Sequence, residues 1–298
     1  ITEGSSGADG TLDVIAIVTS TDFQNMTVGN FDEIEEIRFV GATQTGTFTG
    51  AQLTGEVINL TDTSSSAIST LVINVAAGVT QTFANITAST FTSGTDVITI
   101  NGNSGIENIT GPNISSSINA GNGADIIVGG TAVDTIDGGA GADALTGGQG
   151  NDVYLYNTGD AATGETITEG SSGADGTLDV IAIVTSTDFQ NMTVGNFDEI
   201  EEIRFVGATQ TGTFTGAQLT GEVINLTDTS SSAISTLVIN VAAGVTQTFA
   251  NITASTFTSG TDVITINGNS GIENITGPNI SSSINAGNGA DIIVGGTA

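Results

Sequence analysis

Apolar residues recur at every ninth position along the middle of the chain. In a frame of nine-residue units that begins at Gly102, the eighth position is always apolar. This column consists of Ile109, Ile118, Ile127, Ile136, Leu145 and Tyr154, and Ile100 continues it one unit further back. A fixed period of this length, between polar segments rich in glycine, predicts short strands stacked as the rungs of a β-solenoid.

An acidic column follows the same period, two positions before the apolar one. Residues 120–155 read AGNGADIIV, GGTAVDTID, GGAGADALT and GGQGNDVYL, with Asp125, Asp134, Asp143 and Asp152 at the sixth position. Further back the column decays to Ser116 and Glu107, and Asp291 takes the place of Asp125 in a second copy of the sequence. The glycines at the first, second and fourth positions are Gly121, Gly123, Gly129, Gly130, Gly138, Gly139, Gly141, Gly147, Gly148 and Gly150.

These glycines and acids, with Glu107, are candidate calcium ligands. Glycine adopts positive φ at no steric cost, so the carbonyl groups of such turns can point inward. Calcium takes about six to eight oxygen ligands from carboxylates and carbonyls. Units two periods apart should stack on one side, so we expect Asp125 to pair with Asp143 and Asp134 with Asp152, each pair flanking one ion. Glycine and aspartate are also ordinary turn residues, but turns alone do not require one fixed spacing.

The four units resemble the RTX (repeats-in-toxin) family, whose nonapeptide is G-G-x-G-x-D-x-U-x. The resemblance implies Ca²⁺ as the cofactor. It also implies a turn over the first six residues of each unit, a short strand over the last three, and units that alternate between the two sides of a flattened roll. Type I secretion is implied as well, and the tandem copies resemble bacterial surface-layer, filament or giant adhesin arrays.

The nine-residue units belong to a longer repeat, because residues 1–132 and 167–298 are identical. We divide the first repeat (1–166) into an irregular β-solenoid over 1–100, an RTX β-roll over 101–156 and a connector over 157–166. The second repeat, 167–298, stops within its roll, and we expect the chain to be a window cut from a longer array. Strands in the irregular part are predicted at Leu12–Val18, Ile37–Val40, Thr45–Thr49, Val57–Leu60, Thr70–Val75 and Asp96–Ile100.

The predicted fold is therefore all-β: a parallel β-solenoid in tandem repeats, in which an irregular β-helix continues into a calcium β-roll. Three local motifs stay open. Asn30 to Glu33 resembles a capping box and favours a helical turn as much as a strand. Arg38 lies among acids and forms either a surface ion pair or a contact with a neighbouring rung or chain. Threonines occupy every second position from Thr43 to Thr49, which either strand propensity or an ice-binding face would explain.

Charge and composition restrict the function. The chain has 32 acidic residues and two arginines, no histidine and no cysteine, and a formal net charge of −30. Nucleic acid is excluded as a partner, because phosphate neutralisation needs basic side chains. The usual nucleophile and base pairs are missing, so we expect no enzymatic activity. No run reaches about 18 apolar residues, and no basic leader precedes the repeat, so we expect neither a transmembrane segment nor a signal peptide.

The sequence thus predicts a secreted, calcium-dependent structural protein that forms an extracellular surface layer, filament or adhesin stalk. Identical copies suit self-association into a homopolymer or lattice, because each copy repeats the same contacts. Attachment to a cell surface would lie outside this window. Two alternatives remain: a non-catalytic RTX secretion and folding module of a larger toxin or enzyme, and an ice- or glycan-binding adhesin module.

Overall fold

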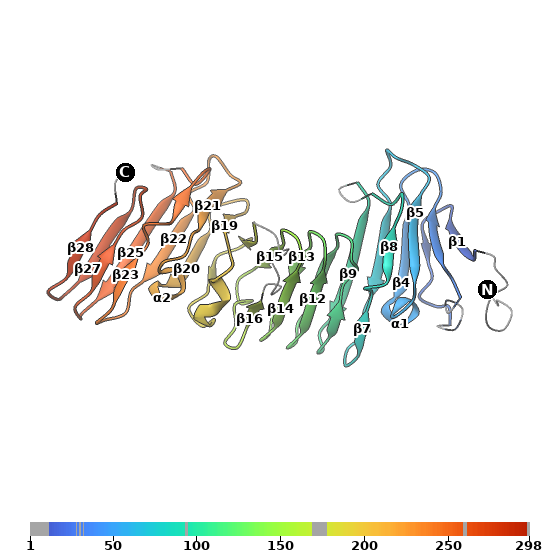
Figure 1. The fold of residues 1–298 in the computed structure, drawn as a ribbon, viewed down its shortest axis with the longest axis horizontal. Coiled ribbons are helices and arrows are strands. Elements are labelled where there is room, and N and C mark those ends of the chain that lie inside the picture. Colours follow the sequence, from blue (N-terminus) through green and yellow to red (C-terminus); the bar gives the residue numbers. More distant parts are fainter. Residues whose placement is uncertain are drawn as a thin grey trace. The chain divides into compact units, whose positions relative to one another are not determined.

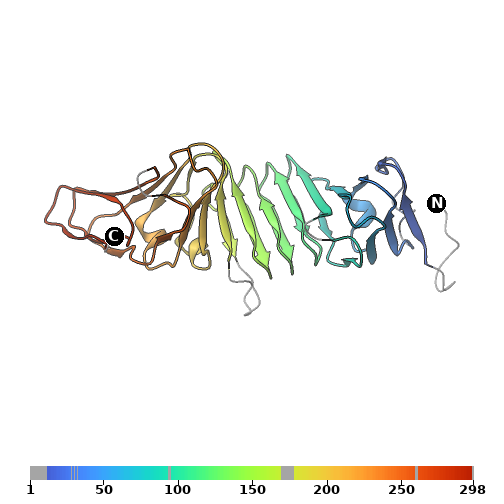
Figure 2. The same cartoon turned by 90° about the horizontal axis from the view of Figure 1, so that it is seen from above.

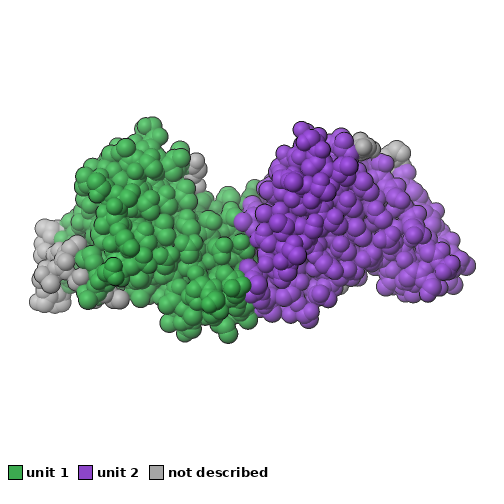
Figure 3. Space-filling view, turned by 180° about the vertical axis from the view of Figure 1, so that it is seen from behind, with its two compact units in different colours: residues 1–138, 144–152, 170–175 green, residues 139–143, 153–169, 176–298 purple. Residues whose placement is uncertain are grey.

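The computed structural model describes residues 12–27, 29, 31, 33–92, 95–168, 178–258 and 261–296. The chain forms two compact units, coloured separately in Figure 3. Unit 1 comprises residues 1–138, 144–152 and 170–175, and unit 2 comprises 139–143, 153–169 and 176–298. Among the described helices, none is long and apolar enough to cross a membrane.

Unit 1 is built from parallel strands that stack in three sheets (Figure 1). The first sheet contains β1 (Val14–Ile17), β3 (Glu36–Phe39), β5 (Ile58–Asp62) and β8 (Ile86–Ala88). The second contains, in order, β2 (Thr21–Asp22), β4 (Thr45–Thr49), β6 (Thr70–Asn74), β9 (Val97–Asn103), β11 (Ser117–Gly121) and β13 (Thr135–Asp137). The third contains β7 (Thr80–Thr82), β10 (Asn108–Thr110), β12 (Ile126–Gly130) and β14 (Ala144–Gly148). One helical turn, α1 (Gly50–Leu53), follows β4.

Unit 2 repeats this arrangement and begins with the end of the first roll (Figures 1 and 2). One sheet contains β15 (Val153–Tyr156), β17 (Val180–Ile183), β19 (Glu202–Phe205), β21 (Asn225–Asp228) and β24 (Thr253–Ala254). A second contains β18 (Thr187–Asp188), β20 (Thr211–Thr215), β22 (Thr236–Asn240), β25 (Val263–Asn269) and β27 (Ser283–Gly287). The remaining elements are β16 (Thr166–Thr168), β23 (Thr246–Thr248), β26 (Asn274–Thr276), β28 (Ile292–Val294), η2 (Val194–Phe197) and α2 (Gly216–Leu219).

The parallel register confirms the solenoid and its continuation into the roll. In unit 1, Thr45 pairs with Thr70 and Thr70 with Val97, so one turn of the irregular part takes close to three nine-residue units. From Thr99 onwards the step shortens to two such units, because Thr99 pairs with Ser117. In unit 2, β15 of the first roll pairs directly with β17 of the second repeat. The division into repeats at residue 166 stays a prediction.

All six strands predicted in the irregular part are present, with ends shifted by up to three residues. Sequence patterns did not reveal the short strands β2, β7 and β8, or α1. Asn30 and Asp32 of the predicted capping box lie outside the described residues. In the second repeat, η2 places a single 3₁₀ turn where this motif recurs.

The core is thin and changes composition along each repeat. In the irregular part, Phe48 stacks on Phe23 with ring centroids 4.7 Å apart and meets Phe31 edge-on. In the roll, single aliphatic side chains such as Ile127 and Leu145 replace these aromatic rings and are fully buried. The nine-residue apolar column therefore forms the centre of the roll, as its period predicts.

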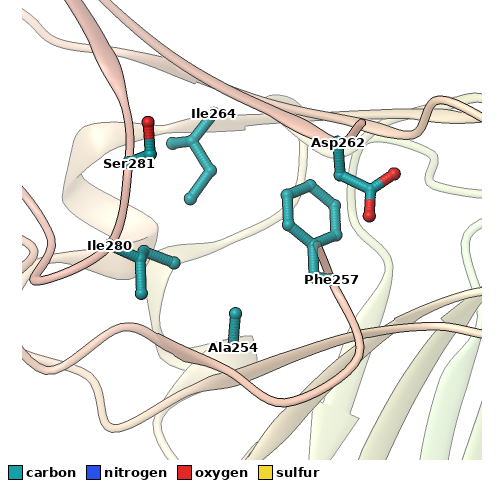
Figure 4. Close-up of a pocket in the computed structure, with 6 residues that line it drawn as sticks. All are labelled: Ala254, Phe257, Asp262, Ile264, Ile280 and Ser281. Atoms are coloured by element: carbon teal, nitrogen blue, oxygen red, sulfur yellow. The ribbon is translucent and has the colours of Figure 1, made fainter. Parts of the chain in front are cut away.

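A pocket opens in each unit where wide rungs give way to narrow ones. In unit 2 it has a volume of about 210 Å³ and is lined by Ala254, Phe257, Asp262, Ile264, Ile280 and Ser281 (Figure 4). The equivalent pocket in unit 1 measures about 150 Å³. The following rung belongs to the narrower roll and leaves the corner of the wider rung uncovered. Asp262 is a structural residue there, because its two carboxylate oxygens accept the N–H groups of Ser235 and Thr258.

Arg38 pairs with a glutamate on its own strand. Its Nε and Nη2 donate to Glu36 Oε1 and Oε2 at 2.7 and 2.9 Å, and Thr61 on the next strand donates to the same carboxylate at 2.5 Å. The hydrogen bond from Arg38 lowers the pKa of the buried Glu36 carboxyl. The ion pair between Arg38 and Glu36 thus lies within one chain, and the hydroxyl of Thr61 links it to the next rung.

Replacing Glu36 with glutamine is therefore expected to reduce the free energy of unfolding by about 1 kcal/mol at neutral pH. Because the pKa of Glu36 is lowered in the folded state, the wild-type advantage is present above its ordinary value of 4.5 and is lost as the pH falls through the folded value. Urea denaturation at pH 7 and at about pH 3 measures both effects. An equal loss of stability at the two pH values would contradict the ionic origin.

Candidate metal centre

The acidic column lies inside the roll, at the point where each strand begins. Asp125, Asp134, Asp143 and Asp152 immediately precede β12, β13, β14 and β15. Each of the four side chains is at most 1% exposed. Alternate strands β10, β12 and β14 pair in one sheet and β11 and β13 in another, which confirms the two-sided roll. Burying four carboxylates requires compensation by hydrogen bonds or by a cation.

One oxygen of three of these carboxylates is held by the backbone of the preceding rung. The N–H groups of Glu107, Ser116 and Asp134 donate at 2.7 Å to the Oδ1 atoms of Asp125, Asp134 and Asp152. Each bond spans two nine-residue units, so each of these three aspartates clamps the rung before its own. Asp291 repeats the contact in unit 2, where it accepts the N–H of Glu273 at 3.0 Å.

The second oxygen of Asp134 marks the candidate ion position. Asp134 Oδ2 is buried and has no hydrogen-bond partner among the described residues. A Cβ atom added to Gly129 would lie 2.5 Å from the carbonyl oxygen of Gly147 and 2.8 Å from Asp134 Oδ2. Glycine at 129 thus keeps open a space that two oxygens from different segments already face. A buried carboxylate oxygen and a carbonyl oxygen are the donors that calcium prefers.

The glycine positions divide into two kinds. Those at the second position of each unit have positive φ: 99° at Gly121, 151° at Gly130, 81° at Gly139 and 106° at Gly148. Gly123 and Gly150, at the fourth position, share this property. Gly129, Gly138, Gly141 and Gly147 do not adopt a positive φ. At Gly129 a side chain is excluded instead because the carbonyl oxygen of Gly147 lies too close.

Burial and repulsion between neighbouring carboxylates raise the pKa values of the acidic column. Burial, and to a lesser degree the charge of Asp152, raises the pKa of Asp134 from 3.8 to about 7. Burial also raises the pKa of Asp152 to about 6 and that of Asp125 above its ordinary value. The fold thus brings Asp134 and Asp152 together as predicted. Asp125 and Asp143 belong to different units, and their pairing around one ion stays a prediction.

Calcium binding is expected to weaken about tenfold when the pH is lowered from about 8 to about 6. Near pH 7 a proton competes with calcium for Asp134, because the pKa of this carboxyl is about 7 without the ion. In the calcium-free protein, by contrast, raising the pH is unfavourable for the folded state. The folded state holds the proton more tightly than the unfolded chain, so its stability falls as the pH rises from about 4 to about 7. Calcium titrations followed by calorimetry at both pH values test the first effect, and a pH-independent affinity would contradict it.

Glu165 extends the column beyond the nine-residue frame. Its Oε2 accepts the N–H of Asp143 at 3.0 Å, the role that aspartate plays in the other rungs. Its Oε1 accepts the hydroxyl of Tyr156 at 3.1 Å, and burial, with the charge of Asp143, raises its pKa to about 8. The spacing from Asp143 is not a multiple of nine, so the period does not reveal it. The equivalent clamps of Asp13 by Glu35 and of Asp179 by Glu201 show the same spacing.

The residues present fit calcium better than a metal held by side chains alone. No group of three or more histidine, cysteine or acidic side chains comes close enough to hold a metal among the described residues. Most ligands would therefore be backbone carbonyl oxygens of the glycine turns, with one carboxylate oxygen from each rung. Asp134 and Gly147 supply such oxygens on one side of the roll, and Glu107, which is fully buried, starts the column on the other side.

Comparison with known proteins agrees with this donor set. The family model described as the RTX calcium-binding nonapeptide repeat (4 copies) matches residues 119–154. No curated protein sequence and no solved structure matches the chain. The matched segment contains the four buried aspartates and the glycine turns between them. Residues 119–154 are therefore RTX calcium-binding nonapeptide repeats, and calcium is the ion that they bind.

Proposed function

We propose that this chain is part of a secreted, non-catalytic structural protein that forms an extracellular surface layer, filament or adhesin stalk from stacked β-solenoid repeats. The observation that carries the proposal is that roll strands pair directly with solenoid strands within each unit. In unit 1 the roll strand β11 pairs with β9 of the irregular solenoid, and in unit 2 the roll strand β15 pairs with β17 of the next repeat. These pairings support a roll that would form part of the stalk rather than an appendage to it.

Calcium would act as the folding switch in this proposal. Extracellular calcium modules have dissociation constants of about 10⁻⁴ to 10⁻³ M, so calcium near 1 mM stabilises each site by about 0.4 to 1.4 kcal/mol. Several coupled sites add up to a large part of a marginal stability of about 5–15 kcal/mol. This stabilisation disappears at the low calcium concentration of a cytosol, which would keep the chain unfolded for type I secretion.

Electron microscopy of the native material, with calcium and after chelation, tests the proposal. Ordered filaments or sheets are expected in millimolar calcium and should disperse when calcium is removed. A soluble, monomeric product attached to a catalytic domain would instead support the alternative of a secretion and folding module. The outward threonines of β4 favour an ice- or glycan-binding module as a further alternative, which ice-recrystallisation and glycan-array assays would detect.

A further inference from the structure

One sheet face in each unit carries columns of mostly hydroxyl and amide side chains. In unit 1 the strands β4, β6, β9 and β11 pair in parallel, so the outward side chains of Thr47, Val72, Thr99 and Ser117 form one column. The intervals between them in the sequence are unequal, which hides the column from any search for a fixed period. In unit 2, Thr213, Val238, Thr265 and Ser283 form the same column.

A second column on this face is an amide ladder. Asn101 Nδ2 donates to Asn74 Oδ1 at 3.1 Å, and Asn74 Nδ2 donates to Gln24 Oε1 at 3.0 Å. In unit 2 the same bonds join Asn267 to Asn240 and Asn240 to Gln190. These bonds hold the side chains in place before any partner arrives, which lowers the entropic cost of binding. We call the outward surface of β4, β6, β9 and β11, and its copy in unit 2, the threonine–asparagine face.

The threonine–asparagine face is uncharged although the chain has a net charge of −30. Two copies of such an acidic chain repel each other unless they meet on neutral surfaces. Each hydroxyl and each primary amide both donates and accepts hydrogen bonds, so the face is complementary to itself. A contact between identical surfaces related by a twofold axis requires this property.

We propose that the threonine–asparagine face is the lateral contact surface between copies of this chain. The inference rests on the proposed assembly and names the surface that makes it. Four strands about 4.8 Å apart and about five residues long span only about 300 Å². A stable interface buries about 800 Å² on each partner, so one face is too small and several linked repeats must engage together. Association should therefore strengthen with the number of repeats.

The sheet containing β7, β10, β12 and β14 supplies the control. It is uncharged as well, but it exposes Ile126 and shows no amide ladder between its described strands. Thr110 on β10 and Thr99 on β9 are both outward-facing, half-buried threonines in central strands. The same pair exists in unit 2 as Thr276 and Thr265.

Sedimentation of the 298-residue chain in millimolar calcium tests the proposal. The double variant Thr99→Glu, Thr265→Glu places like charges opposite each other and is expected to raise the concentration for half-association at least tenfold. The control variant Thr110→Glu, Thr276→Glu is expected to shift it less than twofold. Unchanged far-ultraviolet circular dichroism and thermal midpoints show that both variants are folded.

Unaltered association of the Thr99, Thr265 variant, or an equal loss in the control, would overturn the proposed face and leave the assembly function standing. A wild-type chain that stays monomeric at every concentration, also as a tandem array of four repeats, would overturn both. Retention of such a monomer on a neutral polysaccharide matrix would assign the face to a glycan instead.

Discussion

Removal of calcium with EGTA is expected to abolish the near-ultraviolet circular dichroism of Tyr154 and Tyr156. These are the chain's two tyrosines, it has no tryptophan, and both lie buried in β15. Tyr156 donates to Glu165, which also clamps Asp143, so the signal reports directly on the acidic column. Without a cation, the buried charges of Asp134 and Asp152 cost about 3–4 kcal/mol each above pH 7, a large part of a stability of about 5–15 kcal/mol.

Readdition of calcium should restore the tyrosine signal, whereas the same concentration of magnesium should not, because magnesium demands a smaller octahedral site. The far-ultraviolet signal of the irregular solenoid should persist in part, since its core is built on the packed rings of Phe23, Phe31 and Phe48 rather than on a column of carboxylates. A tyrosine spectrum that is identical with and without EGTA would refute the calcium switch.

Replacement of Asp134 with asparagine is expected to have opposite effects in the two states. Without calcium, near pH 8, the neutral amide removes a buried charge and should stabilise the fold by up to about 4 kcal/mol. The amide oxygen can still accept the N–H of Ser116, which donates to Asp134 at 2.7 Å in the wild type. With calcium, the variant lacks one charged ligand, so added calcium should raise its thermal midpoint less than that of the wild type.

Thermal unfolding followed by far-ultraviolet circular dichroism, in EGTA and in millimolar calcium, measures both effects. Asp22→Asn removes the same charge at an exposed position and should change the free energy of unfolding by less than about 0.5 kcal/mol in either condition. A loss of stability of the Asp134 variant in EGTA would show that the carboxylate acts as a structural hydrogen-bond acceptor rather than as an ion ligand.

The roll could be predicted because each position of the nine-residue unit has the same structural role in every rung. Ile127 and Leu145 fill the same place on neighbouring rungs, and Asp134 and Asp152 do so in the acidic column, so the nine-residue period survives in the sequence. The rungs of the irregular part vary in length, and the pairing of Thr47 with Val72 and of Val72 with Thr99 leaves no period. Strands such as β5 were still predictable from their β-branched residues, but their register was not.

Glu165 escaped prediction for a related physical reason. The chain between Asp143 and Glu165 is longer than in the clamps made by aspartate, and the longer glutamate side chain reaches the same backbone N–H group. The short strand β7 escaped because its sequence, Thr-Gln-Thr, has a polar residue at the inward position, where Gln81 is buried. Both cases show a side chain whose role is set by the neighbouring rung rather than by its own segment.

The direction of the clamps gives the molecule a folding polarity. The backbone N–H groups of Glu107, Ser116 and Asp134 bind carboxylates that come later in the chain, and Asp143 binds the later Glu165. When a chain emerges N-terminus first, the carboxylate that binds the backbone of its newest rung has not yet appeared. When a chain emerges C-terminus first, each such carboxylate appears before the rung that it binds. For the same reason, unravelling of a folded array should start from its C-terminal end, where the last rung has no successor to hold it.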